Sequence, residues 1–402
     1  MKRKKIFIHI GTEKTGTSSI QKNLNLNREE LIKKRYYIPT SPGLENHRKL
    51  SAYSLSKDKF DDFHMFNHIS TLEEKEEFEK KFIIEFQKEI TNKLNDYDYL
   101  ILSSEHFHSR LRSEEELYKL KNSLAVIDAE IKIIIYLRPQ IDVAISHYST
   151  SLKNGGTETL EEFIVTNCSL ENYYYNYEEI LALWAKVFGK ENIIARLYDK
   201  NELFNNDLID DFMNILNLYG LINKKTNNVN SSMNAIGQKL YRELNKELPF
   251  FTEYEIENNN HRQLNKKIVE LFEGKGEYPD IEFAKKLQSQ FDKSNESIRK
   301  NYFSKNKKIL EVDYSKYINK EYPGSEKYID FFIHILQSDL QSSITNDNID
   351  LFRDSAIKLE NVDIALSYKL MTLAKKFRPD GAKINLKVQE YKNLIKNKKN
   401  IK

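Results

Sequence analysis

A glycine-containing loop near the start of the chain is the first stretch whose residues could do chemistry. The apolar run IFIHI leads into GTEKTGTSS, and a strand that turns through such a loop into a helix directs backbone N–H groups and the helix dipole toward one point. Gly11 and Gly16 have the spacing of a phosphate-binding Walker A loop, but Thr17 stands where that motif has lysine. Lys14 therefore reaches a bound anion from the side. The predicted anion-binding residues of the loop are Gly11, Lys14, Thr15, Gly16, Thr17 and Ser18.

A second anion-binding element is predicted after IKIIIYLRP, whose continuous β-branched residues indicate a buried strand. Arg138 stands at the carboxyl end of this strand, the edge at which open parallel sheets bind ligands. Ser146 comes eight residues later, on the helix that we expect to follow. Taken alone, the loop could be a plain strand-to-helix turn and Arg138 a solvated strand end. Together, two anion sites on one sheet edge favour a nucleotide with phosphates at both ends of its ribose.

The two elements together resemble the PAPS-dependent sulfotransferases (PAPS, 3′-phosphoadenylyl sulfate), with the bacterial and carbohydrate members closest. KTGTS at residues 14–18 is similar to the family's 5′-phosphosulfate loop, and LRPQIDVAISHY is similar to its 3′-phosphate element; the resemblance covers about residues 5–215. It implies that Lys14 neutralises charge on the bridging oxygen as the sulfuryl group leaves, while Arg138 and Ser146 hold the 3′-phosphate. It also implies that PAPS is the co-substrate and that no metal is required.

Sulfuryl transfer to a hydroxyl needs a base in line with the leaving group, and the resemblance implies a histidine or a glutamate. LENHRKLSAY offers Glu45 and His47, while LSSEHFHSR offers Glu105, His106 and His108. By order along the chain, the first cluster resembles the place of the base in glycan sulfotransferases, and the second resembles an acceptor-lining loop. A structural role is open for both clusters. The predicted catalytic residues are Lys14, His47, Glu105 and His106.

The resemblance implies an enzyme that moves the sulfuryl group of PAPS to a hydroxyl of a carbohydrate or glycolipid. One alternative is a P-loop kinase or NTPase, which the missing lysine after Gly16 argues against. The other is a non-catalytic module that keeps the nucleotide fold while the C-terminal helices bind a protein partner. The tyrosines in ENYYYNY could stack on sugar rings, or could pack where the next helix meets the sheet.

The elements that position these residues alternate between strands and helices, which predicts an α/β fold with a P-loop-type parallel sheet flanked by helices and a helical C-terminal extension. Asn27 with Glu30 resembles a capping box, and Ser113 with Glu116 is a second cap. We expect strands at residues 5–10, in YYIPTSP, ending near Ser103, at 131–139 and in NIIARLYD. We expect helices from about Thr15, at 27–34 and 72–95, from about residue 141 to the glycines at 155–156, and at 177–188.

The chain is expected to form two regions. Residues 1–320 form a sulfotransferase-like α/β domain that is helical from about residue 207, and residues 325–402 form a C-terminal helical region. The breakers in INKEYPGSEKY, 318–328, mark the boundary. Two amphipathic helices around residues 378–381 resemble one tetratricopeptide-like unit, or a helical hairpin docked on the main domain.

Composition narrows the class of protein. The 63 basic and 60 acidic residues are interspersed and leave a net charge of only +3, which argues against nucleic acid as the main partner. Cys168 is the only cysteine, so no internal disulfide is expected, and we expect it to be buried. No apolar run has a membrane-spanning length, and the basic start lacks a signal peptide's long apolar core. We expect a cytoplasmic protein, and the many Lys, Asn and Ile residues suggest an AT-rich bacterial genome.

Overall fold

The computed structural model describes residues 3–223, 233–247, 268–304, 307–317, 346–361 and 363–399. The chain divides into two compact units. The first unit consists of Met1–Ser231 with Glu277–Ile318, and the second consists of Ser232–Gly276 with Asn319–Lys402. The domain boundary predicted at residues 318–328 lies outside the described residues. No helix in the described part of the chain has both the length and the apolar character needed to cross a membrane.

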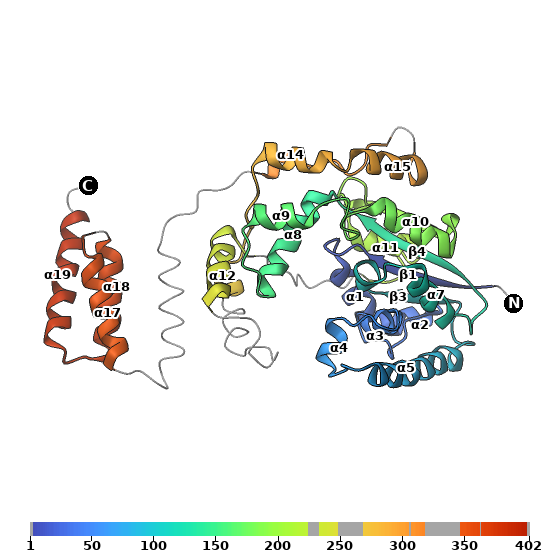
Figure 1. Ribbon diagram of the computed structural model, residues 1–402, viewed down its shortest axis with the longest axis horizontal. Helices are drawn as coiled ribbons and strands as arrows, with labels where there is room; N and C mark the ends of the chain where they lie inside the picture. Colours follow the sequence, from blue (N-terminus) through green and yellow to red (C-terminus); the bar gives the residue numbers. More distant parts are fainter. Residues whose placement is uncertain are drawn as a thin grey trace. The chain divides into compact units, whose positions relative to one another are not determined.

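The first unit is built on a five-stranded parallel sheet with the strand order β2-β3-β1-β4-β5, so the predicted α/β class is confirmed (Figure 1). Because β1 lies between β3 and β4, the segments that follow these three strands meet at one edge of the sheet. The strands are β1 (Lys4–Gly11), β2 (Tyr36–Tyr37), β3 (Tyr99–Ser103), β4 (Ala129–Leu137) and β5 (Ile193–Leu197).

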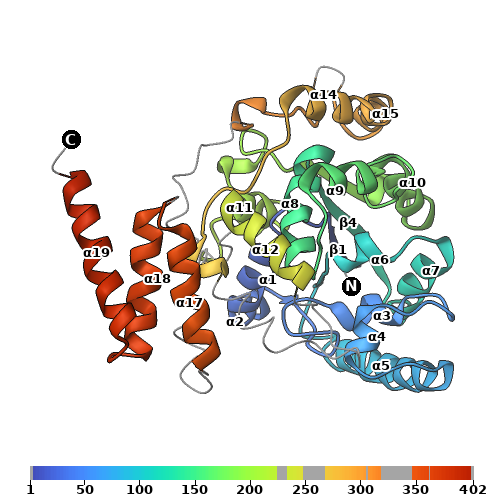
Figure 2. The same ribbon diagram turned by 60° about the vertical axis from the view of Figure 1, so that its left-hand side comes forward.

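Both faces of the sheet are buried, which explains the unbroken apolar runs of its central strands. Ile133 and Ile135 of β4 belong to one apolar cluster with side chains of α5, α7 and α10. Ile134 points to the other face and belongs to a cluster with α1, α2 and α11. Figure 2 shows the sheet between these two groups of helices. The helices of this unit are α1 (Thr17–Leu26), α2 (Arg28–Lys33), α3 (Arg48–Tyr53), α4 (Asp62–Phe66), α5 (Leu72–Asn92), α6 (His106–Arg110), α7 (Glu114–Ser123), α8 (Gln140–Lys153), α9 (Leu160–Asn167), α10 (Tyr177–Phe188), α11 (Leu208–Ile215), α14 (Ile281–Ser289) and α15 (Asp292–Tyr302).

Three local predictions differ from the structure. The first helix begins at Thr17 rather than at about Thr15, because Gly16 has a left-handed backbone with φ 75°. The capping box at Asn27 is not formed, since the Asn27 amide donates to the carbonyl of Asn23 and so caps the end of α1 instead. The strand predicted in YYIPTSP is reduced to two residues, and Pro39 has no N–H to extend it. The Ser113 cap and the burial of Cys168 are confirmed.

The second unit contains α12 (Ala235–Glu247), α17 (Asn346–Leu359), α18 (Ile364–Phe377) and α19 (Ala382–Lys399). The predicted pair of helices around residues 378–381 is confirmed as α18 and α19. A hairpin of two helices cannot bury its own apolar face, and α17 supplies the missing partner. The buried cluster of these three helices consists of Ile349, Phe352, Ala356, Met371, Leu373, Ala374, Ile384, Val388 and Tyr391. Binding of a protein partner by this region stays a prediction.

Candidate active site at the carboxyl edge of the sheet

The loop between β1 and α1 has an unusual backbone that its sequence makes possible. Gly11, Lys14 and Gly16 all have positive φ angles, of 106°, 65° and 75°. A Cβ on Gly16 would lie too close to Cδ2 of Leu208 in α11, which would have to shift, and the positive φ itself favours glycine here. The N–H and the hydroxyl of Thr12 both donate to the carbonyl of Tyr136, which fastens the loop to the end of β4.

The other predicted loop residues differ in how free their hydroxyls are. The Thr15 hydroxyl donates to the carbonyl of Thr12 at 2.6 Å, so it is used within the loop. Thr17 is buried at the first position of α1, whereas Ser18 is exposed. Backbone N–H groups of the loop and the Ser18 hydroxyl are therefore the groups best placed to receive an anion.

Lys14 is held by α8 rather than by a carboxylate. Its ammonium donates to the hydroxyl of Thr150. Burial lowers the pKa of Lys14, while the neighbouring charge of Glu13 acts in the opposite direction. Ser146 lies four residues before Thr150 on α8, and residues with this spacing share one face of a helix. Ser146 and the Lys14 ammonium are therefore on the same side of α8.

Arg138 follows directly after β4, as predicted, and its side chain reaches the loop. Its Nη1 donates to the carbonyl of Lys14 at 3.2 Å, and its Nε lies 3.9 Å from the carboxylate of Asp142. The Tyr177 hydroxyl donates to the Arg138 carbonyl at 2.9 Å and fixes this backbone position. The structure thus brings Lys14 and Arg138, which are far apart in sequence, to one place on the sheet edge.

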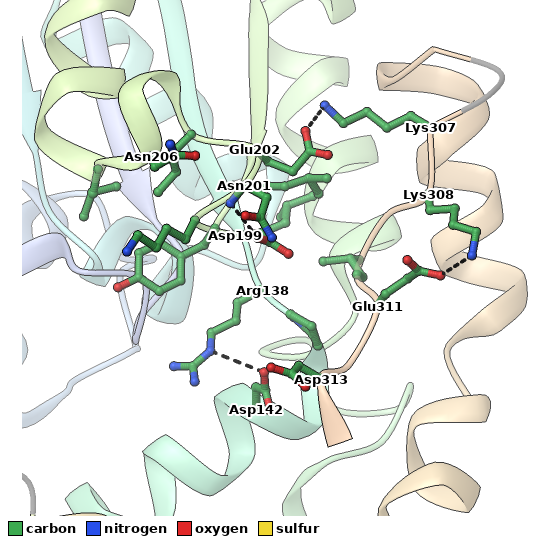
Figure 3. A pocket seen from close by; sticks show the side chains of 18 of the residues that line it. Arg138, Asp142, Asp199, Asn201, Glu202, Asn206, Lys307, Lys308, Glu311 and Asp313 are labelled. Atoms are coloured by element: carbon green, nitrogen blue, oxygen red, sulfur yellow. Dashed lines mark hydrogen bonds and ion pairs between the residues drawn. The ribbon is translucent and has the colours of Figure 1, made fainter. Parts of the chain in front are cut away.

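A cavity of about 970 Å³ opens beside Arg138 (Figure 3). Its walls come from the ends of β4 and β5, the residues that follow β5, and a second segment at residues 307–316. Lys307 pairs with Glu202, and Lys308 lies 3.0 Å from Glu311. Sequence reasoning missed this second segment. The sequence signal that could have indicated it is the lysine run KNKK at residues 305–308, which interrupts the predicted helical part of the chain.

Glu105 lies beside the loop at the carboxyl end of β3. A Cβ on Gly11 would lie 3.5 Å from the Cα of Glu105, an ordinary van der Waals distance, so Glu105 packs directly beside the start of the loop. Glu105 Oε2 accepts from the amides of Gln21 and Asn46, at 2.6 and 2.9 Å. These two hydrogen bonds therefore fix the Glu105 carboxylate next to the loop between β1 and α1.

His47 occupies a different environment. Its side chain is buried, and the Nδ1 of its imidazole accepts from the N–H of Ser103 at 3.0 Å. The backbone N–H of His47 donates to the carbonyl of Ser103. Burial lowers the pKa of His47 to about 3, so the imidazole is neutral at physiological pH. These contacts tie the segment before α3 to the end of β3, which favours a structural role.

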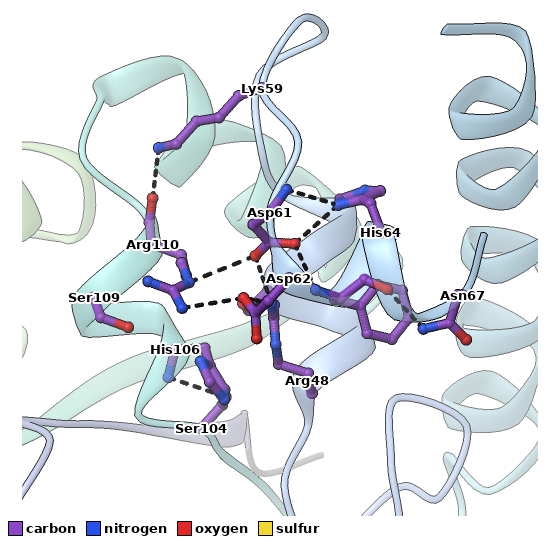
Figure 4. Close-up of polar contacts among 12 residues, drawn as sticks. Arg48, Lys59, Asp61, Asp62, His64, Asn67, Ser104, His106, Ser109 and Arg110 are labelled. Carbon is purple, nitrogen blue, oxygen red and sulfur yellow. Dashed lines mark hydrogen bonds and ion pairs between the residues drawn. The ribbon is translucent and has the colours of Figure 1, made fainter. Parts of the chain in front are cut away.

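His106 lies on α6 next to a set of ion pairs, the arginine–aspartate network of Arg48, Asp61, Asp62 and Arg110 (Figure 4). Arg48 Nη2 lies 2.9 Å from Asp62, and Arg110 Nη2 lies 3.0 Å from the same carboxylate. The network joins α3, α4 and α6. Burial lowers the pKa of His106, so this imidazole also favours its neutral form.

The tyrosines of residues 173–177 are buried, with exposed fractions between 0 and 7% for Tyr173, Tyr174, Tyr175 and Tyr177. This burial favours packing over stacking on an exposed sugar. Tyr174 also reaches the loop, because its hydroxyl donates to Glu13 Oε2 at 3.1 Å. Glu13 is a site residue that sequence reasoning missed.

Comparison with known proteins finds similarity to parts of other chains. No family model matches the chain. The chain is 25% identical over 217 residues to an uncharacterized protein of Archaeoglobus fulgidus, a match that covers 52% of this chain and 56% of that protein. This chain thus spans just over half the length of that curated relative. Among solved structures, a sulfotransferase from Alicyclobacillus acidocaldarius matches with 20% identity and a TM-score of 0.30, over 49% of this chain and 74% of that one.

Proposed function

We propose that this protein is a PAPS-dependent sulfotransferase that transfers the sulfuryl group to a hydroxyl of a carbohydrate or glycolipid acceptor. The observation that supports this most is the hydrogen bond from Arg138 to the Lys14 carbonyl. It makes the loop after β1 and the arginine after β4 one continuous basic region on adjacent strands. A donor that carries anionic groups at both ends of its ribose needs two such sites at a short separation.

In this proposal the loop N–H groups and Lys14 bind the 5′-phosphosulfate, and Arg138 with Ser146 binds the 3′-phosphate. The cavity beside Arg138, at about 970 Å³, is large enough for the nucleoside part of the donor. Lys14 leaves the Thr150 hydroxyl, a neutral partner, to neutralise the bridging oxygen of the donor.

Glu105 is the proposed general base. As the acceptor oxygen forms its bond to sulfur, the bond between sulfur and the bridging oxygen breaks, and the acceptor proton passes to the Glu105 carboxylate. Glu105 is favoured over His47 because its backbone packs against Gly11, whereas the His47 Nδ1 is occupied by the Ser103 N–H. His106, whose backbone N–H contacts the Ser104 hydroxyl at 3.3 Å, is proposed to line the acceptor side of Glu105.

Titration with PAP (adenosine 3′,5′-bisphosphate) and with magnesium-ATP tests the donor class. We expect PAP to bind without added metal and to raise the melting temperature, with no comparable effect of magnesium-ATP. The reverse result would favour the P-loop kinase alternative. Sulfur-labelled PAPS with a panel of glycans and glycolipids then tests transfer. PAP binding without transfer to any acceptor would favour the non-catalytic alternative.

A further inference from the structure

Glu13, directly before Lys14, is a loop residue whose carboxylate is bound by a tyrosine hydroxyl from elsewhere in the first unit. The Tyr174 hydroxyl donates to its Oε2 at 3.1 Å. Burial raises the pKa of Glu13, but the neighbouring Ser109 side chain and the nearby imidazoles outweigh it, and the net pKa lies below its usual value. The group is therefore an ionised acceptor for the Tyr174 hydroxyl.

The Tyr174 hydroxyl that binds Glu13 is itself held in place. The Tyr174 ring stacks on His147 of α8 with centroids 4.9 Å apart and an interplanar angle of 16°. His108 of α6 donates to the Tyr174 carbonyl at 3.1 Å, and its ring centroid lies 4.8 Å from that of Tyr174. Contacts with α6 and α8 thus fix the position of the Tyr174 hydroxyl, which donates to Glu13.

The loop needs such an attachment because its backbone is strained at a residue with a side chain. Lys14 has φ 65°, a conformation that residues other than glycine rarely adopt. Such conformations persist where the surrounding structure fixes them. Arg138 donates to the carbonyl of Lys14 from the end of β4, and the Tyr174 hydroxyl donates to the carboxylate of the preceding residue, Glu13.

We propose that Glu13 is a positioning residue whose hydrogen bond from Tyr174 holds the loop in the conformation that presents Lys14 and the loop N–H groups to the donor. This inference rests on the proposed function. Glu13 acts through the loop and does not contact the reacting atoms. The hydrogen bond from Tyr174 to Glu13 and the hydrogen bond from Arg138 to the Lys14 carbonyl then fix two neighbouring residues of the loop.

PAP binding measured by calorimetry tests the proposal with four variants and a fifth as control. We expect Glu13→Ala to weaken PAP binding about tenfold and Tyr174→Phe to weaken it about fivefold. The double variant Glu13→Ala/Tyr174→Phe should bind PAP as tightly as Glu13→Ala alone, because both changes remove the same hydrogen bond. Glu13→Gln keeps an oxygen acceptor and should stay within about twofold of wild type. Tyr173→Phe is the matched control, because its hydroxyl makes no hydrogen bond to the described residues of the loop, and it should bind PAP like wild type.

The outcomes separate this inference from the proposed function. If wild type does not bind PAP, the proposed function fails and the inference with it. If wild type binds PAP and both Glu13→Ala and Tyr174→Phe keep its affinity, the inference is wrong while the proposed function stands. Additive losses in the double variant would also overturn it, because the two groups would then act separately. Should Glu13→Ala fail to fold, Tyr174→Phe against Tyr173→Phe decides the question alone.

Discussion

Two basic regions of the first unit hold their cations in different ways. At the sheet edge, Arg138 donates to the Lys14 carbonyl and Lys14 donates to the Thr150 hydroxyl, so both cations bind neutral groups. Carboxylates also lie near these cations: the Asp142 carboxylate is 3.9 Å from Arg138 Nε, and the charges of Glu13 and Glu105 act on Lys14. In the arginine–aspartate network, by contrast, both arginines contact carboxylates at closer range.

The difference shows that the charge of the bonded partner, more than the type of the cationic residue, decides whether a cation is available to bind an anion. A cation bound to a carbonyl or hydroxyl keeps its charge available for an incoming anion. A cation bound to a carboxylate is already neutralised, and removing one member of a buried pair costs about 3–5 kcal/mol. We therefore propose that the sheet edge binds the ligand and that the network stabilises the fold.

Lys14→Ala is expected to have the largest effect on the sheet-edge side of the comparison. Transfer from PAPS should fall about a thousandfold, because the ammonium opposes the charge that develops on the bridging oxygen. PAP binding should fall much less, since the loop N–H groups remain. Steady-state turnover with labelled PAPS measures the first quantity and calorimetry the second, with the exposed Lys34→Ala as control. Turnover within a few-fold of wild type would remove Lys14 from the mechanism.

Glu105→Gln tests which side chain receives the acceptor proton. We expect kcat to fall about a hundredfold with PAP affinity unchanged, because the amide cannot accept a proton. His47→Asn should instead lower the melting temperature and leave kcat close to wild type, since its contact with Ser103 is structural. Loss of turnover in His47→Asn without loss of stability would reverse the assignment of the base.

Arg138→Ala and Arg48→Ala compare the two regions directly. Arg138→Ala should weaken PAP binding about a hundredfold with little change in melting temperature, as expected for a charge-assisted contact with a phosphate. Arg48→Ala should leave PAP affinity unchanged and destabilise the protein by about 2 kcal/mol, because buried Asp61 then keeps only His64 and the more distant Arg110 as partners. Calorimetry and denaturant titration measure the two effects. The opposite pattern would break the distinction between the regions.

The smallest effect is expected in acid. Burial raises the pKa of Asp61, but bonds from His64 and Arg48 outweigh it and hold the pKa well below its usual value. A carboxyl with a lowered folded-state pKa stabilises the fold above its unfolded pKa of about 4 and loses this contribution as the pH falls further. The melting temperature should therefore fall between about pH 5 and pH 2, less steeply in Asp61→Asn. Equal slopes would show that the network adds no acid-sensitive stability.

Sequence reasoning succeeded where a signal lies in neighbouring residues. The isoleucines of residues 131–135 predicted the buried strand β4, and the stripe of Phe82 and Phe86 predicted the long helix α5. It was less successful where one residue can serve two elements. Asn27 has the type of an N-cap, but its amide binds the end of the preceding helix, and only the packed structure distinguishes the two uses.

The order of strands and helices, the glycines of the loop, and the positions of Lys14 and Arg138 at strand ends followed from the sequence alone. These features depend on residue type and period over short stretches. Only the tertiary structure shows that Tyr174 binds Glu13, that Arg138 donates to the Lys14 carbonyl, and that His47 is buried against Ser103. Such contacts join residues that are distant in the chain, and their partners are selected by how helices and strands pack, which no local pattern specifies.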